Sequence, residues 1–327
     1  MAPTTPTRSP RPDGSCNSFV AAVIAVAVAC LLPTAVRADE PPKAEKVRIL
    51  FVANSYSHWN HLPRLLEAFV AAGQKRDAEV MPFTSAGAPL SWHLKDGRAM
   101  KWLTGDTKDF VAGAERGVAK VREQIAKDPD KGEGYPGSYK ITLKDQLREK
   151  EIESARAKDP RWDYVFLLFF TDDYAADDEE ITKRVKTFAD AAREHKVVPI
   201  VWLPWGGTED LKRYAPIARE LKVKLVPTSF AEQLHRSGKL AATTPVKWGG
   251  GHPDARTTYL YACMFYAAMF DKSPEGLPVY KLRGYSEKEA NVELTPEEAA
   301  KLQKSAWQAV QAYRELEAAL PKSGEKK

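Results

Sequence analysis

The most constraining feature of the chain is the stretch YVFLLFF at residues 164–170, which is apolar at every position. A strand of this kind is buried on both faces, as the central strands of parallel sheets are. Further short apolar runs, typical of strands, lie at residues 47–53, 79–83, 197–203 and 224–227. Segments with apolar residues at helical spacing alternate with them, at residues 62–72, 181–195 and 210–221. This alternation predicts an α/β protein, namely a three-layer α/β/α sandwich with a central parallel sheet.

The N-terminal residues have the three-part pattern of a secretory signal peptide. An unbroken apolar run at residues 19–32 follows two arginines, and small or apolar side chains flank Arg37 near a cleavage position. A membrane anchor is the alternative, but the run is shorter than the ~20 residues that span a bilayer. We therefore expect residues 1–38 to be removed and residues 39–46 to form a polar linker. The mature protein would then be secreted or periplasmic, without stable membrane insertion.

Cysteine content and charge restrict the classes of partner and of covalent chemistry. Cys16 and Cys30 fall in the predicted signal peptide, so the mature chain keeps Cys263 alone and forms no intramolecular disulfide. The formal charge of the whole chain is +5, of which residues 1–38 carry +2. A charge this small and scattered does not favour a nucleic-acid partner.

The domain predicted between residues 47 and 285 is interrupted by a charged insertion. Residues 105–159 are rich in Lys, Glu, Asp, Gly and Pro and carry only a weak helical pattern of apolar residues. We interpret them as a solvated insertion, and a lid over an active site is the alternative. Residues 286–327 follow the domain. A capping box at residues 295–298 there predicts an amphipathic C-terminal helix, followed by a polar tail.

Two polar residues far apart in the sequence are candidates for catalysis. Ser55 follows the first predicted strand, and a serine at such a turn exposes its hydroxyl at the carboxyl edge of the sheet, where open α/β folds bind ligands. His252 precedes the apolar helix predicted at residues 258–270, and from that loop it can reach the same edge. Ser55 as nucleophile and His252 as general base is therefore a reasonable pair. A turn residue or helix cap is the alternative interpretation of Ser55.

Several stretches resemble the conserved blocks of the SGNH, or GDSL-type, hydrolases, in the variant with Gly-Asn-Ser in place of Gly-Asp-Ser. They are ILFVANSYS (49–57), NHLP (60–63), TSAGAPL (84–90), WDYVFL (162–167) and HP (252–253). The resemblance extends from about residue 47 to residue 270, outside the charged insertion. It implies an SGNH or flavodoxin-like fold and hydrolysis of esters through an acyl-enzyme on Ser55. The resemblance also implies that the backbone N–H of Gly87 contributes to an oxyanion hole, with Asn54 near the oxyanion or substrate.

The chain departs from this family pattern at two positions. The family has an Asp three residues before the histidine, where this chain has Gly249. Loss of such an orienting carboxylate lowers the rate by up to about 10⁴. The family also places an Asn or Gln amide in the third block, where this chain continues LFFTDD at residues 168–173. One missing oxyanion donor lowers the rate by about 10² to 10³.

These departures leave two functional hypotheses. The first is an exported esterase or deacetylase that acts on the acyl groups of a small molecule or carbohydrate. The second is a non-catalytic protein of the same fold that binds a small molecule or glycan in the former cleft. A metal-dependent hydrolase built on His58, His61, His93 and His252 is a third class. Since the chain has no helical His-x-x-x-His pair, we expect no metal and no other cofactor.

Two tryptophans at the end of the fourth predicted strand have two alternative roles. Trp202 and Trp205 stand beside Gly206 and Gly207 at the presumed ligand edge of the sheet. They would line a sugar or acyl pocket if they face that edge. They would pack in the core if they face the sheet.

Overall fold

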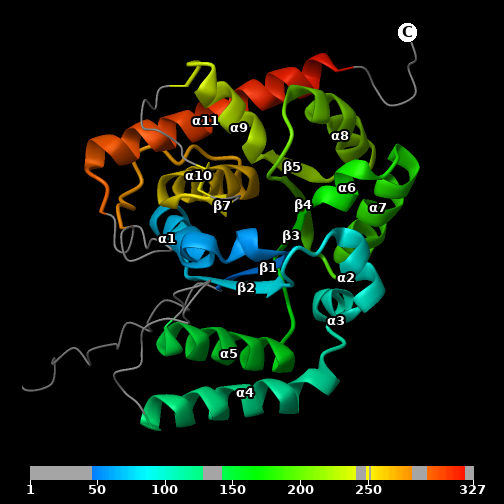
Figure 1. Cartoon of the computed structure of the whole chain (residues 1–327), viewed down its shortest axis with the longest axis vertical. Helices are drawn as coiled ribbons and strands as arrows, with labels where there is room; N and C mark the ends of the chain where they lie inside the picture. The colour runs from blue at the N-terminus through cyan, green and yellow to red at the C-terminus, as the bar shows by residue number, and fades with distance from the viewer. Residues whose placement is uncertain (1–45, 128–141, 241–247, 250–251, 282–292, 321–327) are drawn as a thin grey trace, which may run out of the picture. The chain divides into compact units, whose positions relative to one another are not determined.

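A computed structural model of the chain shows, in the residues that it describes, a sheet of five parallel strands in the order β2-β1-β3-β4-β5 (Figure 1). The strands are β1 (Val47–Ala53), β2 (Ala78–Thr84), β3 (Tyr164–Leu168), β4 (Val198–Leu203) and β5 (Lys224–Pro227). This is the flavodoxin-like strand order. The predicted α/β class with a parallel sheet is therefore confirmed.

The structure describes residues 46–127, 142–240, 248–249, 252–281 and 293–320. They belong to one unit that runs from Ala44 to Lys327. The predicted signal peptide, and the predicted linker except for Lys46, lie outside the described residues. Within the described part of the chain, no helix is long and apolar enough to cross a membrane.

Helices cover both faces of the sheet, which gives the three predicted layers (Figure 1). One face carries α1 (Leu62–Gln74), α10 (Ala255–Phe270) and α11 (Pro296–Ala319), with α9 (Thr228–Arg236) against α11. The other face carries α2 (Leu90–Asp96), α3 (Arg98–Thr104), α6 (Thr171–Ala175), α7 (Asp178–Glu194) and α8 (Thr208–Glu220). Alternate side chains of β1 enter the two cores: Ile49 and Phe51 join the first, and Leu50 and Val52 join the second. All four side chains are fully buried.

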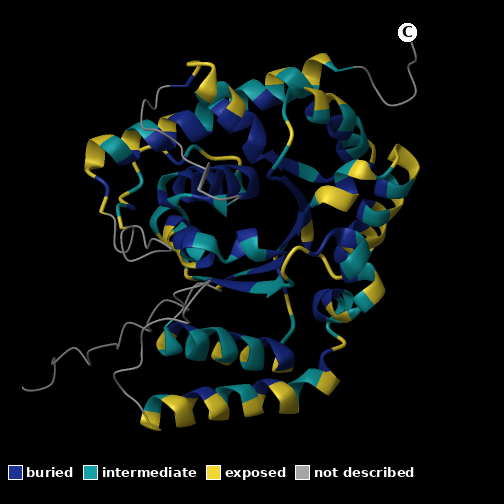
Figure 2. Ribbon diagram, viewed as in Figure 1, coloured by how far each residue is buried: buried dark blue, intermediate teal, exposed yellow. Residues whose placement is uncertain are grey.

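The helix α10 is buried along almost its whole length (Figure 2). Its Phe265 packs against Phe51 of β1 and Phe166 of β3, with ring centroids 5.8 and 4.8 Å apart. Cys263 lies in the same helix with no exposed surface, and burial raises the pKa of its thiol well above the ordinary value. This cysteine is therefore a buried apolar residue rather than a reactive thiol.

The charged insertion forms two helices, α4 (Lys108–Lys127) and α5 (Leu143–Lys158), which pack against each other. α4 is mostly exposed, as a solvated segment should be, whereas α5 lies beside the edge strand β2 (Figures 1 and 2). Ion pairs attach α5 to its neighbours: Arg64–Asp145 at 2.6 Å, Arg156–Glu79 at 2.7 Å and Arg148–Glu67. The insertion is thus anchored by charged side chains together with a few buried apolar ones, among them Ala114, Ile152 and Ala157, which explains why its hydrophobic pattern is weak.

Short elements carry the predicted site residues. Two turns of 3-10 helix, η1 (Ser55–Ser57) and η2 (Trp59–His61), connect β1 to α1. A small antiparallel pair, β6 (Trp248–Gly249) and β7 (His252–Pro253), precedes α10 and places Gly249 opposite His252. The predicted capping box of the last helix is present, since Thr295 and Glu298 exchange hydrogen bonds between side chain and backbone.

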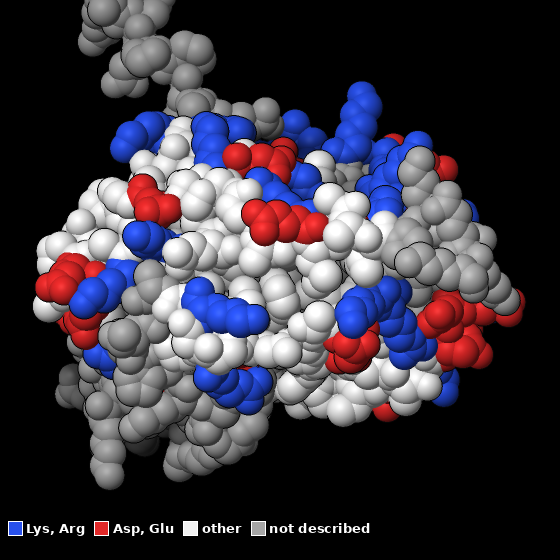
Figure 3. All heavy atoms as spheres, turned by 90° about the horizontal axis from the view of Figure 1, so that it is seen from above, with Lys and Arg blue, Asp and Glu red and all other residues white. Residues whose placement is uncertain are grey.

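Charges of both signs are mixed on the surface. On the face shown in Figure 3, Lys and Arg lie among Asp and Glu, with uncharged surface between them. A nucleic-acid footprint is a continuous basic patch or stripe, and the described part of this face carries none.

Candidate active site

The predicted site residues lie at the topological switch point of the sheet. β1 pairs with β2 on one side and with β3 on the other, and the chain leaves β1 and β3 toward opposite faces of the sheet. The carboxyl ends of these two strands therefore border the crevice in which open α/β sheets bind ligands. Ser55 stands two residues after the end of β1, at the start of η1.

The structure brings Ser55 and His252 together across 197 residues of sequence. The hydroxyl Oγ of Ser55 lies 2.9 Å from Nε2 of His252, which is hydrogen-bonding distance. Burial lowers the pKa of His252 below its ordinary value, so the imidazole is neutral at neutral pH and can accept the hydroxyl proton. This geometry is that of a nucleophile and its general base.

Aromatic rings, rather than a carboxylate, surround His252. The indole of Trp59 is stacked on the imidazole, with centroids 3.7 Å apart and planes at 11°. The ring of Tyr56 lies at 5.1 Å on a tilted plane. No acidic side chain among the described residues contacts His252, and desolvation alone accounts for its lowered pKa. The cross-strand neighbour of His252 is Gly249, where the SGNH hydrolases have their Asp.

The segment after Trp59 has an unusual backbone. Asn60 and His61 are consecutive non-glycine residues in the left-handed region, with φ of 51° and 54°. Such residues cost on the order of 1 kcal/mol each and persist where their surroundings hold them. The buried amide of Asn60 does so, because Nδ2 donates to the carbonyl of Pro253 and to Oγ1 of Thr258, each at 2.8 Å.

Asn54 stabilises the turn that presents Ser55. Its Oδ1 accepts a hydrogen bond from the N–H of Tyr56 at 3.1 Å, and its carbonyl accepts one from the hydroxyl of Ser57 at 2.9 Å. The Nδ2 of Asn54 is enclosed and has no partner among the described residues. Asn54 therefore acts on the nucleophile through the backbone, and its predicted contact with an oxyanion stays a prediction.

Two backbone N–H groups are available as oxyanion donors. Gly87 has φ of 65° in a turn closed by the bond from the N–H of Ala88 to the carbonyl of Ser85, and an L side chain would be strained there. Ser85 in turn donates to the carbonyl of Ala53 at 3.2 Å, which holds this turn beside the end of β1. In the described part of the chain, the N–H groups of Gly87 and Ser55 have no intramolecular acceptor. Their role as oxyanion donors stays a prediction.

The third family block has an aromatic side chain and a buried acid in place of the amide. The ring of Phe170 lies 3.8 Å from where a Cβ on Gly87 would stand. Asp173 is fully buried and accepts hydrogen bonds from the N–H groups of Leu90 and Phe170 at 3.0 and 2.9 Å. Arg184 pairs with the same carboxylate at 3.0 Å. Burial raises the pKa of Asp173 above its ordinary value. Asp173 thus connects the end of β3 to α2, and Arg184 offsets its charge.

The other histidines are engaged elsewhere. His93 is buried, and its Nε2 donates to the carbonyl of Ala53 at 2.9 Å, while burial lowers its pKa. His58 pairs through Nε2 with Oγ1 of Thr84 at 2.5 Å and through Nδ1 with Glu149 at 3.7 Å. Among the described residues, no group of three or more His, Cys, Asp and Glu side chains is arranged to hold a metal ion.

The two tryptophans after β4 have different roles. Trp202 has no exposed surface, and its Nε1 donates to Oγ1 of Thr228 at 2.9 Å, so it packs in the core. Trp205 is partly exposed and contacts Tyr56 and Phe170, with centroids 4.6 and 5.0 Å apart. Trp205, Tyr56 and Phe170 thus form a group of contacting rings, called the aromatic wall below, whereas Trp202 has no surface left for a ligand.

Sequence reasoning missed Trp59 and Asn60 as neighbours of His252. Asn60 begins the second matching stretch and Trp59 directly precedes it, close to Ser55, and that proximity is the signal that could have indicated them. Their contact with His252 depends on the left-handed backbone at Asn60, which no sequence pattern in this segment predicts.

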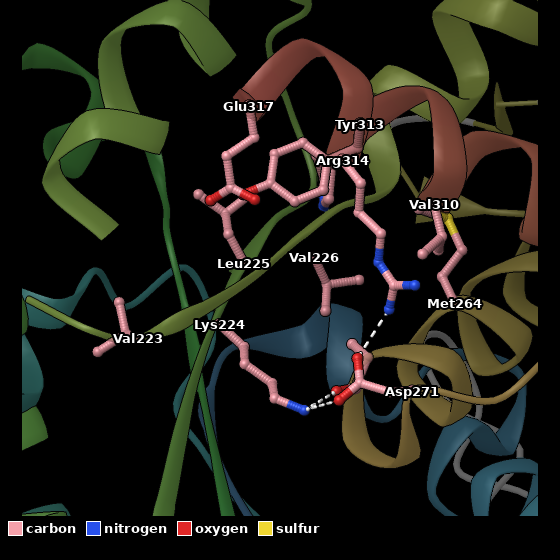
Figure 4. Close-up of a pocket in the computed structure, with 12 residues that line it drawn as sticks. Val223, Lys224, Leu225, Val226, Met264, Asp271, Val310, Tyr313, Arg314 and Glu317 are labelled. Atoms are coloured by element: carbon pink, nitrogen blue, oxygen red, sulfur yellow. Dashed lines mark hydrogen bonds and ion pairs between the residues drawn. The ribbon is translucent and has the colours of Figure 1, made fainter. Parts of the chain in front are cut away.

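A pocket away from this site lies between β5, α10 and α11 (Figure 4). Its volume is about 200 Å³, and apolar side chains such as Met264 and Val226 line its floor. Lys224 and Arg314 both pair with Asp271 at its rim, at 2.8 and 2.7 Å. None of its lining residues comes from the segments that carry Ser55, Gly87 or His252.

Comparisons with known proteins give matches among solved structures only. No family model matches the chain, and neither does any curated protein sequence. A protein from Slackia heliotrinireducens described as a candidate SGNH hydrolase matches with 17% identity and a TM-score of 0.39, over 69% of this chain and 100% of that one. TesA matches with 12% identity and a TM-score of 0.37, over 67% of this chain and 97% of its own. Because both TM-scores are below 0.5, the assignments that follow rest on the sheet and site of this chain.

Proposed function

We propose that this protein is a serine hydrolase of the SGNH type that cleaves carboxylic esters through an acyl-enzyme on Ser55. The observation that carries the proposal is the 2.9 Å hydrogen bond between Ser55 Oγ and His252 Nε2 at the switch point of the sheet. Acyl transfer requires a hydroxyl held on a neutral imidazole, together with backbone N–H groups that can donate to the oxyanion.

The reaction follows from these groups. Ser55 Oγ attacks the ester carbonyl carbon while its proton passes to Nε2 of His252. The N–H groups of Gly87 and Ser55 donate to the oxyanion of the tetrahedral intermediate. When the intermediate collapses, the C–O bond to the alcohol breaks, and the alcohol takes the proton from His252. A water molecule then attacks the acyl-enzyme with His252 as base, which releases the acid and restores Ser55.

The aromatic wall supports a carbohydrate or apolar acyl ester as substrate. Tyr56, Trp205 and Phe170 form a continuous set of ring contacts beside Ser55. Tyr56 is buried, so the partly exposed rings of Trp205 and Phe170 are the ones that would pack against an apolar acyl chain or the apolar face of a sugar. We therefore propose acetylated or short-chain acylated saccharides as the first substrates to assay.

Export is part of the same proposal. The apolar run at residues 19–32 and the small residues near residue 38 support cleavage of a signal peptide. Mass spectrometry of the exported protein should give a mature chain that begins near Asp39, and an intact Met1 on that protein would contradict export by cleavage.

The deciding experiment is labelling of the purified mature protein with a fluorophosphonate probe, followed by peptide mapping. An activated serine reacts with this probe whatever its natural substrate is. We expect labelling at Ser55, no labelling in Ser55→Ala, and slow turnover of p-nitrophenyl acetate. A folded wild-type protein that neither reacts nor turns over esters would contradict the proposal. It would favour the second candidate, a binding protein, which the glycine at position 249 and the ring of Phe170 support.

A further inference from the structure

The general base of the proposed hydrolase lacks the usual carboxylate, yet its ring is held in a defined orientation. The indole of Trp59 covers one face of the His252 imidazole at a centroid distance of 3.7 Å and an interplanar angle of 11°. This parallel stack restricts rotation of the imidazole about its side-chain bonds. The Nε2 atom therefore stays directed at Ser55 Oγ, 2.9 Å away.

The backbone next to each ring is fixed by a second contact. Asn60 follows Trp59 in the chain, Pro253 follows His252, and the amide Nδ2 of Asn60 donates to the carbonyl of Pro253 at 2.8 Å. The same Nδ2 reaches Oγ1 of Thr258 at the start of α10, also at 2.8 Å. The stack therefore joins Trp59 to His252, and the hydrogen bond joins the next residue of each segment, which holds the two segments side by side.

Asn60, which makes this hydrogen bond, has an energetically unfavourable conformation and environment. Asn60 is 4% exposed and left-handed, and its Oδ1 is enclosed without a partner among the described residues. A buried, strained residue with an unsatisfied polar atom persists only where the surrounding structure holds it, and such residues cluster at functional sites.

The stack also has an electrostatic consequence. The proposed mechanism has Nε2 accept the proton of Ser55, which requires the proton of neutral His252 on Nδ1 and gives an imidazolium in the transition state. In the described residues no carboxylate faces that cation, but the negative face of the indole does. An indole over a cation is worth roughly tenfold in equilibrium or rate, well short of the roughly 10⁴ of a triad carboxylate.

We propose that Trp59 is the positioning residue of His252: it orients the imidazole toward Ser55 and stabilises its cationic form in place of a triad acid, with Asn60 as its anchor. This inference rests on the proposed hydrolase activity. Its test therefore includes one measurement that needs no catalysis.

The first test follows fluorophosphonate labelling of Ser55 against pH in the full mature protein. We expect Trp59→Leu to lower the plateau rate by about tenfold and to move the midpoint of the profile to lower pH, because the imidazolium loses its stabilising face. Trp59→Phe keeps an aromatic face and should stay within about threefold of wild type. Trp307→Leu, in α11, is the matched control and should leave rate and midpoint unchanged. An unchanged plateau in Trp59→Leu, or a midpoint that rises, would overturn the inference, since the indole would then only shield the ring from water.

The second test uses tryptophan fluorescence, because a protonated imidazole quenches an indole stacked on it. Wild type and Ser55→Ala should show a pH-dependent quench at the same midpoint, and His252→Ala and Trp59→Phe should lack it. A quench without any labelling would show that the stack exists while the hydrolase proposal fails. Labelling without a quench would leave the hydrolase in place and refute the role of Trp59. If Trp59→Leu does not fold, as judged by thermal unfolding, the comparison of wild type with His252→Ala and Trp59→Phe still decides.

Discussion

Two imidazoles flank the turn that carries Ser55, and they have opposite surroundings. His252 bonds a serine hydroxyl at 2.9 Å, is stacked on an indole and has no described acid beside it. His58 bonds the hydroxyl of Thr84 at 2.5 Å and has Glu149 of the insertion 3.7 Å from its Nδ1. By composition alone, the second set is the more complete hydroxyl–imidazole–carboxylate array.

The comparison shows that the place of a hydroxyl in the fold matters more than the types of residue around it. Thr84 is the last residue of the edge strand β2 and pairs in register with Ala53, so it is part of the sheet. Ser55 lies beyond the end of β1, in a turn at the switch point, and its backbone N–H has no acceptor among the described residues. We therefore expect the serine, and not the threonine, to be the hydroxyl that attacks a carbonyl carbon.

The largest expected effect compares the two hydroxyls directly. Ser55→Ala should lower ester turnover by at least about 10⁴, because the covalent intermediate cannot form. Thr84→Val removes only the partner of His58 and should stay within about tenfold of wild type. Kinetics with p-nitrophenyl acetate and probe labelling measure both. Labelling that persists in Ser55→Ala and disappears in Thr84→Val would reverse the assignment.

The next largest effect is expected from a substitution that gives His252 the neighbouring acid that it lacks. Gly249 is opposite His252 in the β6–β7 pair, and side chains at opposing positions have Cβ atoms about 4.5–5.5 Å apart. Gly249→Asp should therefore raise turnover by an appreciable part of about 10⁴. The pKa of His252, lowered by burial in the wild type, should rise beside the new charge, so the acid limb of the pH–rate profile should move to higher pH.

Gly249→Asn is the matched control, because it has the same shape without the charge. It should give at most a small part of the gain. A folded Gly249→Asp protein, checked by thermal unfolding, that is no faster than wild type would mean that an acid at this position cannot reach Nδ1.

A smaller effect is expected from substitution of Asn60, whose amide bonds the segment that carries His252. Asn60→Ala removes two buried hydrogen bonds, so the free energy of unfolding should fall by about 2 kcal/mol. Labelling of Ser55 should slow by roughly tenfold, because His252 loses its fixed orientation. Asn60→Gly removes the same bonds but fits the left-handed backbone and should be less destabilised than Asn60→Ala. Denaturant unfolding measures both, and equal stability of all three proteins would show that the amide holds nothing.

The smallest effect tests the acid on the His58 side. Glu149 and His58 are partly exposed and 3.7 Å apart, so Glu149→Gln should change stability by less than about 1 kcal/mol and labelling of Ser55 by less than about threefold. The same thermal unfolding and labelling assays apply. A loss of labelling comparable to that of His252→Ala would place the insertion in the catalytic mechanism.

Local sequence patterns predicted much of the fold. The features that they did not predict can be explained from particular residues. The apolar run at residues 164–170 predicts a central strand, and β3 has a neighbour on each side in the sheet. The insertion was harder to interpret because α5 is anchored by ion pairs such as Arg156–Glu79, and charged residues in sequence do not indicate burial. Trp202 and Trp205 also remained ambiguous, since residues three apart at a strand end can face either the core or the edge.

By itself, the sequence determined the parallel sheet, the pair Ser55 and His252, and the absence of the family acid at Gly249. These depend on apolar periodicity and on short motifs, which are local properties of the chain. Only the tertiary structure decided what surrounds the imidazole. The contact of Trp59 with His252 requires the left-handed turn at Asn60 and its bond to Pro253, 193 residues away. Such a contact forms only when two segments far apart in the sequence meet, so the sequence of either segment alone does not predict it.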